Sequence, residues 1–304
     1  MAKVYDIVVV GGGPAGLTAS LYGLRNGKTT LVIEKSVFGG QIANSPKVEN
    51  IPGFKSISGD EFGDIMLEQV RNQGGEILFD TVTKVESNNE EVVTYTEMSE
   101  PIHSKTVILA TGTKHRTLGL ANEENLIGKQ IHFCAVCDGN FYKDKKVVMV
   151  GGGNSAFVEA NLLADIASEL VMLQDMPIFT AEAKLQEQLL SRSNVETHVS
   201  TKVLEYVVSD GKLTGVKYSE NGEEKIVNCD GVFLAVGLVP DNEPFTNVAD
   251  IDERGYFKAD ESSITKTANV FVAGDCRVKS LRQVATACSD GANAAIKACE
   301  YLRK

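Results

Sequence analysis

The sequence predicts an α/β fold of two similar domains, with the second domain inserted into the first. A buried strand expected at residues 3–10 runs directly into the glycine turn G-x-G-x-x-G at residues 11–16. The same order of strand, glycine turn, helix and strand occurs again around GGGNSA at residues 151–156, which indicates an internal repeat. The run VFLAVG at 232–237 also resembles VILATG at 107–112, so each half ends on a similar strand and turn. This order of elements is typical of Rossmann-like, dinucleotide-binding (FAD- or NAD(P)-binding) domains.

The first glycine turn is predicted to hold a dinucleotide. We expect a helix over residues 14–26 and a second strand over residues 29–34, which ends on Glu34. Glycines let the backbone approach a pyrophosphate at the helix N-terminus, and an acid at the end of the second strand takes the ribose hydroxyls. The alternative is a plain glycine-rich turn, and the position of Glu34 argues against it.

The remainder of the first half is predicted as loops, one helix and short strands. Residues 38–41 and 48–54 contain glycine or proline and are expected to be loops. Apolar residues near helical spacing predict an amphipathic helix over residues 59–73. Strands are expected at residues 76–79, 84–87, 91–96 and 106–110.

The second half repeats the pattern and then returns to the first domain. Strands at residues 145–150 and 169–173 enclose a helix that ends near residue 165. A strand at residues 269–273 and a long alanine-rich helix within residues 281–301 complete the first domain. The predicted domains are therefore 1–115 together with 242–304 for the first, and 116–241 for the second.

Composition narrows the class of protein. A length of 304 residues fits one or two domains, and a formal net charge of −11 argues against a nucleic-acid partner. No stretch approaches the apolar length of a membrane span, and the N-terminus lacks the pattern of a signal peptide, so we expect a cytoplasmic protein. Six cysteines in such a protein indicate chemistry or burial, not a disulfide scaffold.

The segment CAVCDG at residues 134–139 is the candidate reactive centre. Cys134 and Cys137 can form a redox disulfide, in which one thiolate must be held reactive. The alternative is half of a zinc site, for which His132 is the one close further ligand. The position of the pair between two nucleotide-type turns favours redox chemistry, and no metal site is predicted. Asp138 directly follows the pair, where its side chain could cap a helix or turn.

Together these motifs resemble the low-molecular-weight thioredoxin reductase family of flavoproteins over essentially the whole chain. The matching segments are GGGPAG at 11–16, GGQ at 39–41, VENIPGF at 48–54, ATG at 110–112, CAVCDG at 134–139, GGGNSA at 151–156, and GDC followed by LRQVATA at 274–287. The location of the C-x-x-C in the second domain differs from glutathione- or lipoamide-type reductases, whose cysteines lie in the first domain.

The resemblance implies FAD as the cofactor of the first domain and thioredoxin as the substrate. The residues that it assigns to FAD are Gly11, Gly13, Pro14, Ala15, Gly16, Glu34, Gly40, Gln41, Asn50, Ala110, Thr111, Gly112, Gly274, Asp275, Arg282, Gln283 and Val284. It implies that Cys134 and Cys137 form the catalytic disulfide, with Cys137 nearer the flavin, and that Asp138 moves protons at the thiols. It also implies a homodimer and a large rotation between the domains.

The sequence departs from the family pattern at the second nucleotide site. Members that use NADPH carry H-R-R-x-x-x-R at this strand end, where arginines bind the 2′-phosphate. Here the stretch begins Gln174-Asp175, and no arginine occurs between Arg116 and Arg192. The favoured interpretation is therefore the ferredoxin-dependent, pyridine-nucleotide-independent branch of the family.

Other interpretations stay open from the sequence. NADH could bind through Asp175, or NADPH could bind without the arginines. A flavin-dependent oxidase or regulatory protein with a vestigial disulfide, or a nucleotide-sensing dimer without turnover, would share the fold. The intact CAVCDG segment argues against these last two.

Overall fold

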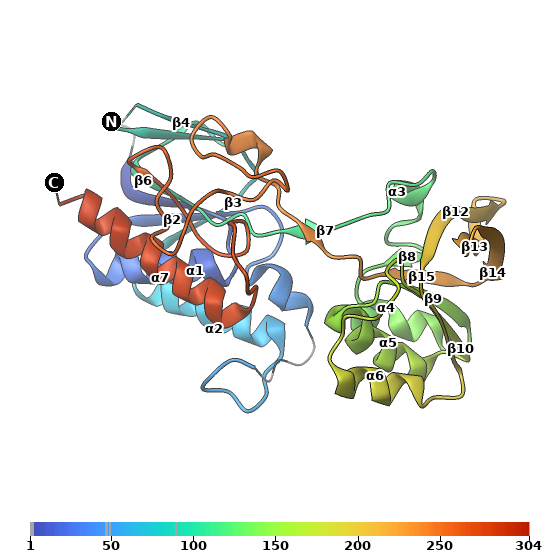
Figure 1. Cartoon of the computed structure of the whole chain (residues 1–304). Coiled ribbons are helices and arrows are strands. Elements are labelled where there is room, and N and C mark those ends of the chain that lie inside the picture. The colour runs from blue at the N-terminus through green and yellow to red at the C-terminus, as the bar shows by residue number, and fades with distance from the viewer. Residues whose placement is uncertain (1–2, 46–47, 49, 89, 304) are drawn as a thin grey trace. The chain divides into compact units, whose positions relative to one another are not determined.

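The chain forms two compact units in a computed structural model that describes residues 3–45, 48, 50–88 and 90–303 (Figure 1). Of the side chains within these ranges, those of Asn44, Val136 and Cys137 are not described. The first unit comprises residues 1–114 and 239–304, and the second comprises residues 115–238. The chain passes between the units through two short strands that pair with each other, β7 (Lys114–His115) and β16 (Leu238–Val239).

The first unit is built on a mixed sheet. Strands run in the order β3-β2-β1-β6-β5-β4, and β17 also pairs with β6. The pairs among β1, β2, β3, β6 and β17 are parallel, whereas β4 and β5 are antiparallel to their neighbours. The bounds are β1 (Val4–Val10), β2 (Thr30–Glu34), β3 (Glu76–Phe79), β4 (Val82–Ser87), β5 (Val92–Thr96), β6 (Ile102–Leu109) and β17 (Val270–Val272). The central strands are runs of valine, isoleucine and leucine because both of their faces are buried.

Helices α1 (Pro14–Arg25), α2 (Gly59–Asn72) and α7 (Val284–Tyr301) pack together on the first unit (Figure 1). The contact between α1 and α7 is close, since a Cβ on Gly291 would lie 2.1 Å from the carbonyl oxygen of Ala15. Ser58 caps α2, accepting a hydrogen bond from the backbone N–H of Glu61. Two short 3₁₀ helices complete this unit, η1 (Gly40–Asn44) and η3 (Glu243–Phe245).

The second unit repeats the parallel arrangement. Its strands run in the order β11-β10-β9-β15-β8, and every pair is parallel. The strands are β8 (Ile131–His132), β9 (Lys146–Val150), β10 (Glu169–Leu173), β11 (Val195–His198) and β15 (Gly231–Leu234). The helical segments are α3 (Glu123–Leu126), α4 (Ala135–Asp138), η2 (Gly139–Tyr142), α5 (Asn154–Ile166) and α6 (Ala183–Leu190).

A three-stranded antiparallel sheet follows β11, and the sequence analysis assigns no strands there. It consists of β12 (Thr201–Ser209), β13 (Lys212–Glu220) and β14 (Glu223–Asn228). One face carries Tyr206, Leu213, Val216 and Tyr218 into the same apolar cluster as the parallel strands. Its hairpin turns place Asp210 and Asn221 at positive φ, each followed by a glycine. These two turns are signals that the sequence analysis did not use.

The predicted elements of the first unit occur with shifted ends. The strand predicted at residues 106–110 begins four residues earlier, at Ile102, because its first half pairs with the antiparallel β5. The final helix begins only at Val284, where Gln283 and Thr286 form a capping box. Within the described residues, no helix is long and apolar enough to cross a membrane.

Candidate active site

The first glycine turn is shaped to bring the backbone close to a ligand. Gly11 has φ of 108°, and a Cβ there would lie 2.2 Å from the carbonyl oxygen of Ala110. A Cβ on Gly16 would lie 1.9 Å from the carbonyl oxygen of Gly11. Helix α1 starts with Pro14 after the N-cap residue Gly13. No side-chain hydrogen bond caps this helix end among the described residues. The backbone N–H groups of this helix end are therefore available to an anion such as a pyrophosphate.

Glu34 is hydrogen-bonded to the first glycine turn. It is the last residue of β2 and is 7% exposed. Its Oε2 accepts a hydrogen bond of 2.6 Å from the backbone N–H of Gly12, and its Oε1 accepts one of 2.8 Å from that of Ser36. The carboxylate is thus fixed at the mouth of the glycine turn, where the ribose of a dinucleotide is bound in this type of fold.

Several further predicted residues are brought together in the first unit. The side chain of Gln41 donates to the carbonyl oxygen of Thr113 at 2.5 Å, and Gly40 has φ of 60°. Asn50 Nδ2 donates to Gln283 Oε1 at 2.9 Å, which joins a loop of the first half to the start of α7. The bond from Asn50 to Gln283 therefore joins two predicted site residues that are distant in sequence.

The remaining predicted contacts follow two neighbouring strands, β6 and β17. Ala110, Thr111 and Gly112 directly follow β6, and the hydroxyl of Thr111 donates a hydrogen bond of 2.8 Å to Oδ1 of Asn242. Gly274 and Asp275 follow β17. Carboxyl ends of neighbouring parallel strands are where ligands bind in such sheets.

Asp275 carries an unsatisfied polar atom. Its Oδ1 is buried and has no hydrogen-bond partner among the described residues. Burial raises the pKa of Asp275, while the positive charges of Lys279 and Arg282 oppose that rise. Arg282 lies over the ring of Tyr256 at 4.1 Å, and its Nε donates to the backbone carbonyl oxygen of Asp275 at 3.3 Å. A buried, unpartnered carboxyl oxygen fits a ligand that offers a hydroxyl or N–H group.

These features fit FAD. The cradle of Gly11 and Gly16 suits the pyrophosphate, Glu34 suits the ribose, and the free oxygen of Asp275 suits the polar chain beyond it. FAD binding of this kind needs no sulfur, imidazole or cluster of carboxylates. None of the described residues forms a group of three or more potential metal ligands.

The candidate reactive segment lies in the second unit, between β8 and η2. Cys134 is disulfide-bonded. The side chain of Cys137 lies outside the described ones, so its pairing with Cys134 stays a prediction. Helix α4 is a single turn, in which the backbone N–H of Asp138 donates to the carbonyl oxygen of Cys134 at 3.1 Å. The backbone N–H of Ala135 donates to the carboxylate of Glu159, whose pKa is raised by burial.

Asp138 faces a buried histidine. Oδ2 of Asp138 lies 2.9 Å from Nδ1 of His132, and the two side chains are 32% and 4% exposed. On the other side of the imidazole, Nε2 of His132 lies 2.8 Å from the hydroxyl of Tyr142. The sequence analysis considered His132 only as a zinc ligand and missed Tyr142. The available signal was the position of His132, two residues before Cys134.

The other cysteines do not join the candidate reactive segment. Cys229, Cys276, Cys288 and Cys299 are free thiols. Burial raises the pKa of each of them, to about 12 for Cys229. Thiols of this kind are poor nucleophiles and metal ligands.

The second glycine turn copies the backbone of the first. Gly151 has φ of 132°, and a Cβ there would lie 2.4 Å from the carbonyl oxygen of Ala235. Gln174, at the end of β10, is 5% exposed, and its Nε2 donates to the carbonyl oxygen of Ile178 at 3.3 Å. Asp175 is exposed. The backbone of the second turn therefore has the shape of the first, but the residue in the position of Glu34 is the neutral Gln174.

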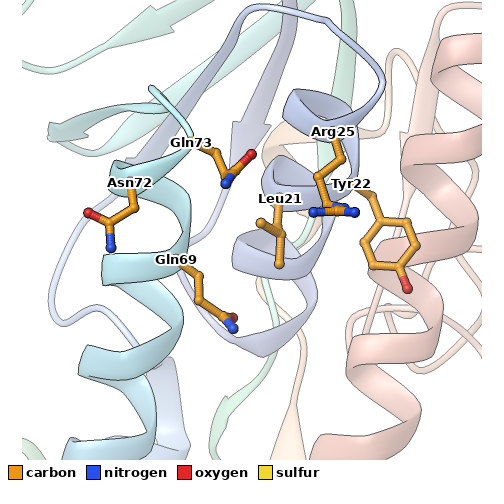
Figure 2. Close-up of a pocket in the computed structure, with 6 residues that line it drawn as sticks. All are labelled: Leu21, Tyr22, Arg25, Gln69, Asn72 and Gln73. Atoms are coloured by element: carbon orange, nitrogen blue, oxygen red, sulfur yellow. The ribbon is translucent and has the colours of Figure 1, made fainter.

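A surface pocket of about 540 Å³ lies between α1 and α2 (Figure 2). Figure 2 shows Leu21, Tyr22 and Arg25 on α1, with Gln69 and Asn72 on α2 and Gln73 directly after it. None of the predicted site residues lines this pocket, whose lining is Leu21, Tyr22, Arg25, Gln69, Asn72 and Gln73. It is therefore not part of the candidate active site.

Comparison with known proteins assigns the family. The model of the pyridine nucleotide-disulphide oxidoreductases matches residues 5–291. A thioredoxin reductase of Listeria monocytogenes is 39% identical over 99% of this chain and 95% of the relative, and that of Bacillus subtilis is 36% identical over 99% and 96%.

Solved structures agree with this assignment. The crystal structure of Lactococcus lactis thioredoxin reductase superimposes with a TM-score of 0.93 at 32% identity, covering 98% of this chain and 99% of that one. The thioredoxin reductase of T. acidophilum superimposes with a TM-score of 0.91 at 33% identity, covering 99% and 100%. The chain therefore belongs to the pyridine nucleotide-disulphide oxidoreductases and, within them, to the low-molecular-weight thioredoxin reductase family.

Proposed function

We propose that the protein is a thioredoxin-disulfide reductase that passes electrons through FAD and a Cys134–Cys137 disulfide to thioredoxin. FAD is the cofactor of this family, and the first unit holds the residues that fit it. The relatives of highest identity named above are thioredoxin reductases. The observation that carries the proposal is the position of Asp138, which follows the cysteine pair and is held against His132.

The residues proposed to bind FAD and those proposed to exchange disulfides lie in different units. Gly11, Gly16 and Glu34 bind the dinucleotide, and Asp275 orients it through the free carboxyl oxygen. Bound FAD supplies a carrier that accepts electrons singly or in pairs. We assign residues 1–115 with 242–304 as the FAD-binding domain, and residues 116–241 as the NAD(P)-binding-like domain with the redox pair.

Disulfide exchange sets the chemistry of the second unit. One thiolate of the reduced pair attacks the disulfide of thioredoxin, and the other resolves the mixed disulfide. Asp138 holds a proton for the departing thiolate and takes one from the attacking thiol. The product thioredoxin leaves with two thiols, and Cys134 and Cys137 return to the disulfide.

We propose ferredoxin as the electron donor. The second glycine turn ends on the neutral, inward-turned Gln174 and the exposed acid Asp175. Arginines that would bind the 2′-phosphate of NADPH are absent from residues 174–180. The second candidate donor is a pyridine nucleotide, because the family is named for that donor and the turn keeps its glycine backbone. NADH would then bind through Asp175.

Anaerobic mixing separates these donors. The holoprotein is mixed in turn with NADPH, NADH and reduced ferredoxin, and flavin reduction is followed together with reduction of thioredoxin. Reduction by ferredoxin alone supports the proposed donor, and saturable reduction by NADPH or NADH replaces it. A holoprotein that reduces no thioredoxin with any donor, or with chemically reduced flavin, overturns the proposed function. We also expect a homodimer, which light scattering of the eluted protein tests.

A further inference from the structure

His132 is a buried, titratable side chain directly behind the candidate reactive segment. Its two ring nitrogens contact Asp138 on one side and Tyr142 on the other. We propose that His132 is a positioning residue that couples the protonation state of Asp138 to Tyr142 and thereby sets Asp138 as the proton donor of the cysteine pair. The inference rests on the proposed function, because that function gives Asp138 its role at the thiols.

The surroundings fix the imidazole in place. His132 lies opposite Phe233 in the pairing of β8 with β15, and their ring centroids are 5.3 Å apart. The ring of Tyr142 meets that of His132 edge-on, also at 5.3 Å. A purely structural role here would be served by an apolar side chain, because an imidazole must be hydrogen-bonded at both nitrogens when buried. Both nitrogens are instead aimed at polar groups, and one of these groups reaches the surface.

The contact of His132 with Asp138 is close but bent. Nδ1 of His132 is buried and makes no well-aligned hydrogen bond, although Oδ2 of Asp138 lies 2.9 Å away. The Asp138 side chain is 32% exposed, so its carboxyl group has room to turn. A small rotation of the carboxyl group would align the two atoms, and Nδ1 has no hydrogen-bond partner among the described residues.

The three side chains can satisfy both protonation states of Asp138. When Asp138 is ionised, Nδ1–H of His132 donates to the carboxylate and Nε2 accepts from the hydroxyl of Tyr142. When Asp138 is protonated, its O–H donates to Nδ1 and Nε2–H donates to the oxygen of Tyr142. The hydroxyl of Tyr142 then donates to the carbonyl oxygen of Lys129, which lies 3.4 Å away. His132 changes tautomer without gaining a charge in its buried position.

The groups around Tyr142 favour this behaviour. Burial is the largest of the effects that raise the pKa of Tyr142 to about 12, and the nearby Asp138, Cys229 and Asp230 act in the same direction. Lys145 Nζ lies 5.6 Å from the centre of the Tyr142 ring. On the side of α5, the carboxylate of Glu159 binds the N–H of Ala135. Tyr142 therefore keeps its proton in the neutral range and remains a donor for His132 or for the carbonyl oxygen of Lys129.

The proton matters because the pair takes up electrons and protons together. An external dithiol reduces the Cys134–Cys137 disulfide by forming its own disulfide, and two electrons and two protons pass to the pair. The first cleavage releases one sulfur of the pair as a thiolate, which takes its proton from Asp138. The pair would return to the disulfide by passing two electrons and one proton to bound FAD and one proton to Asp138. Asp138 would then be protonated again, and His132 would return to the tautomer that carries its proton on Nε2.

Dithiol-driven reduction of the flavin tests the inference without thioredoxin or a physiological donor. The holoprotein is mixed anaerobically with excess dithiothreitol from about pH 5 to about pH 9, and the loss of visible flavin absorbance gives the rate. The variants are His132→Phe, which keeps the ring volume, Tyr142→Phe, Asp138→Asn, and the double variant His132→Phe with Asp138→Asn. FAD content and the unfolding temperature of each variant report its folding.

His132→Phe is expected to slow the reduction about tenfold, a part of the ~10²–10⁴-fold that a positioned proton donor supplies. The rate should depend on pH through Asp138, and Asp138→Asn should abolish that dependence. In His132→Phe the same dependence should move to higher pH, because the ionised carboxylate of Asp138 loses its N–H donor. Tyr142→Phe should move the same dependence in the same direction by less. In the Asp138→Asn background, His132→Phe should cause no further loss.

Two results overturn the inference while leaving the proposed function intact. One is a folded His132→Phe protein with the rate and pH profile of the wild type. The other is a loss of equal size in the wild-type and Asp138→Asn backgrounds, which indicates a structural role only. Should His132→Phe lose FAD, Tyr142→Phe decides, and an unchanged pH profile in that variant overturns the coupling. A wild-type flavin that dithiothreitol does not reduce overturns the proposed function, and the inference with it.

Discussion

Gln174 packs beneath Gly152 of the second glycine turn in the place that Glu34 occupies beneath Gly12 of the first. A Cβ on Gly152 would lie 2.5 Å from the side-chain amide carbon of Gln174, and one on Gly12 would lie 3.0 Å from Cβ of Glu34. Glu34 accepts a hydrogen bond from its turn, whereas Gln174 donates to the carbonyl oxygen of Ile178 in its own loop. The two units thus share a backbone but differ in the group offered to a ribose.

The exposed acid Asp175 and the absence of arginines from residues 174–180 predict a poor response to NADPH, which the double substitution Asp175→Arg with Met176→Arg should improve. Both positions are exposed at the end of β10, where related NADPH-dependent members carry arginines. A hydrogen bond to a charged group contributes ~1.5–3 kcal/mol, so each arginine should raise the affinity for NADPH about tenfold to a hundredfold. Stopped-flow reduction of the flavin over a range of NADPH concentrations measures the change.

The matched control for this experiment is Asp175→Asn with Met176→Gln, which removes the acid without adding a guanidinium group. It should improve the response to NADPH only slightly, and it should weaken NADH if Asp175 binds the ribose hydroxyls. Rapid, saturable reduction of the wild-type flavin by micromolar NADPH contradicts the prediction.

Cys134→Ser and Cys137→Ser should each abolish thioredoxin reduction and leave FAD bound. Exchange needs an attacking thiolate and a resolving partner, while the residues that fit FAD lie in the other unit. Thioredoxin reduction by the chemically reduced holoprotein and the visible flavin spectrum measure the two properties. Cys288→Ser is the control, because Cys288 is a free, half-buried thiol of the first unit. Near wild-type reduction by either single variant of the pair would falsify its catalytic role.

The sequence predicted the parallel cores well because they depend on local signals. Runs such as the one from Ile7 to Val10 are buried on both faces and end at a turn that requires glycine, so pattern and structure agree. The antiparallel sheet of β12, β13 and β14 was missed. Its strands carry polar residues on their outer faces, so they contain no continuous apolar run that would predict a strand.

The candidate site was predictable in its parts but not in its contacts. The turn glycines and Glu34 follow from spacing, whereas Asp275 was assigned from the resemblance to the family. The pair of His132 with Asp138 does not, because it depends on how β8 enters the single turn of α4. The bond from Asn50 to Gln283 joins residues from opposite ends of the chain, and only the packing of α7 brings them together.

Gly16→Ala should lower FAD content strongly. The added Cβ would lie 1.9 Å from the carbonyl oxygen of Gly11, so the turn must shift, at a cost of ~1–3 kcal/mol for overpacking. The shift displaces the N–H groups that suit the pyrophosphate. Flavin released per mole of purified protein measures the effect. Gly153→Ala is the control in the second turn, since its Cβ would meet its nearest neighbour only at 3.6 Å, and it should retain FAD.

Asp290→Asn should destabilise the first unit by ~3–5 kcal/mol, because it breaks a buried ion pair on one side only. Arg277 and Asp290 are each 2% exposed, and two bonds of 2.7 and 2.8 Å join the guanidinium group to the carboxylate. Asp290 also accepts hydrogen bonds from Lys279 and from the backbone N–H of Gly274. The control is Glu261→Gln, which removes the other partner of Arg277. Glu261 is 79% exposed, so this change should cost ~0–1 kcal/mol.

The same ion pair predicts how stability depends on pH. Burial alone would raise the pKa of Asp290, but the hydrogen bonds from Arg277 and Lys279 outweigh it, and the pKa lies below its usual value. A carboxyl group whose pKa is lower in the folded state stabilises fully above its unfolded pKa of about 4 and loses that contribution as the pH falls further. Urea unfolding should therefore show a large gap between wild type and Asp290→Asn at neutral pH that narrows below about pH 4. A gap of constant size across this range, or one equal to that of Glu261→Gln, contradicts the assignment of the buried charge pair as the source of the stability.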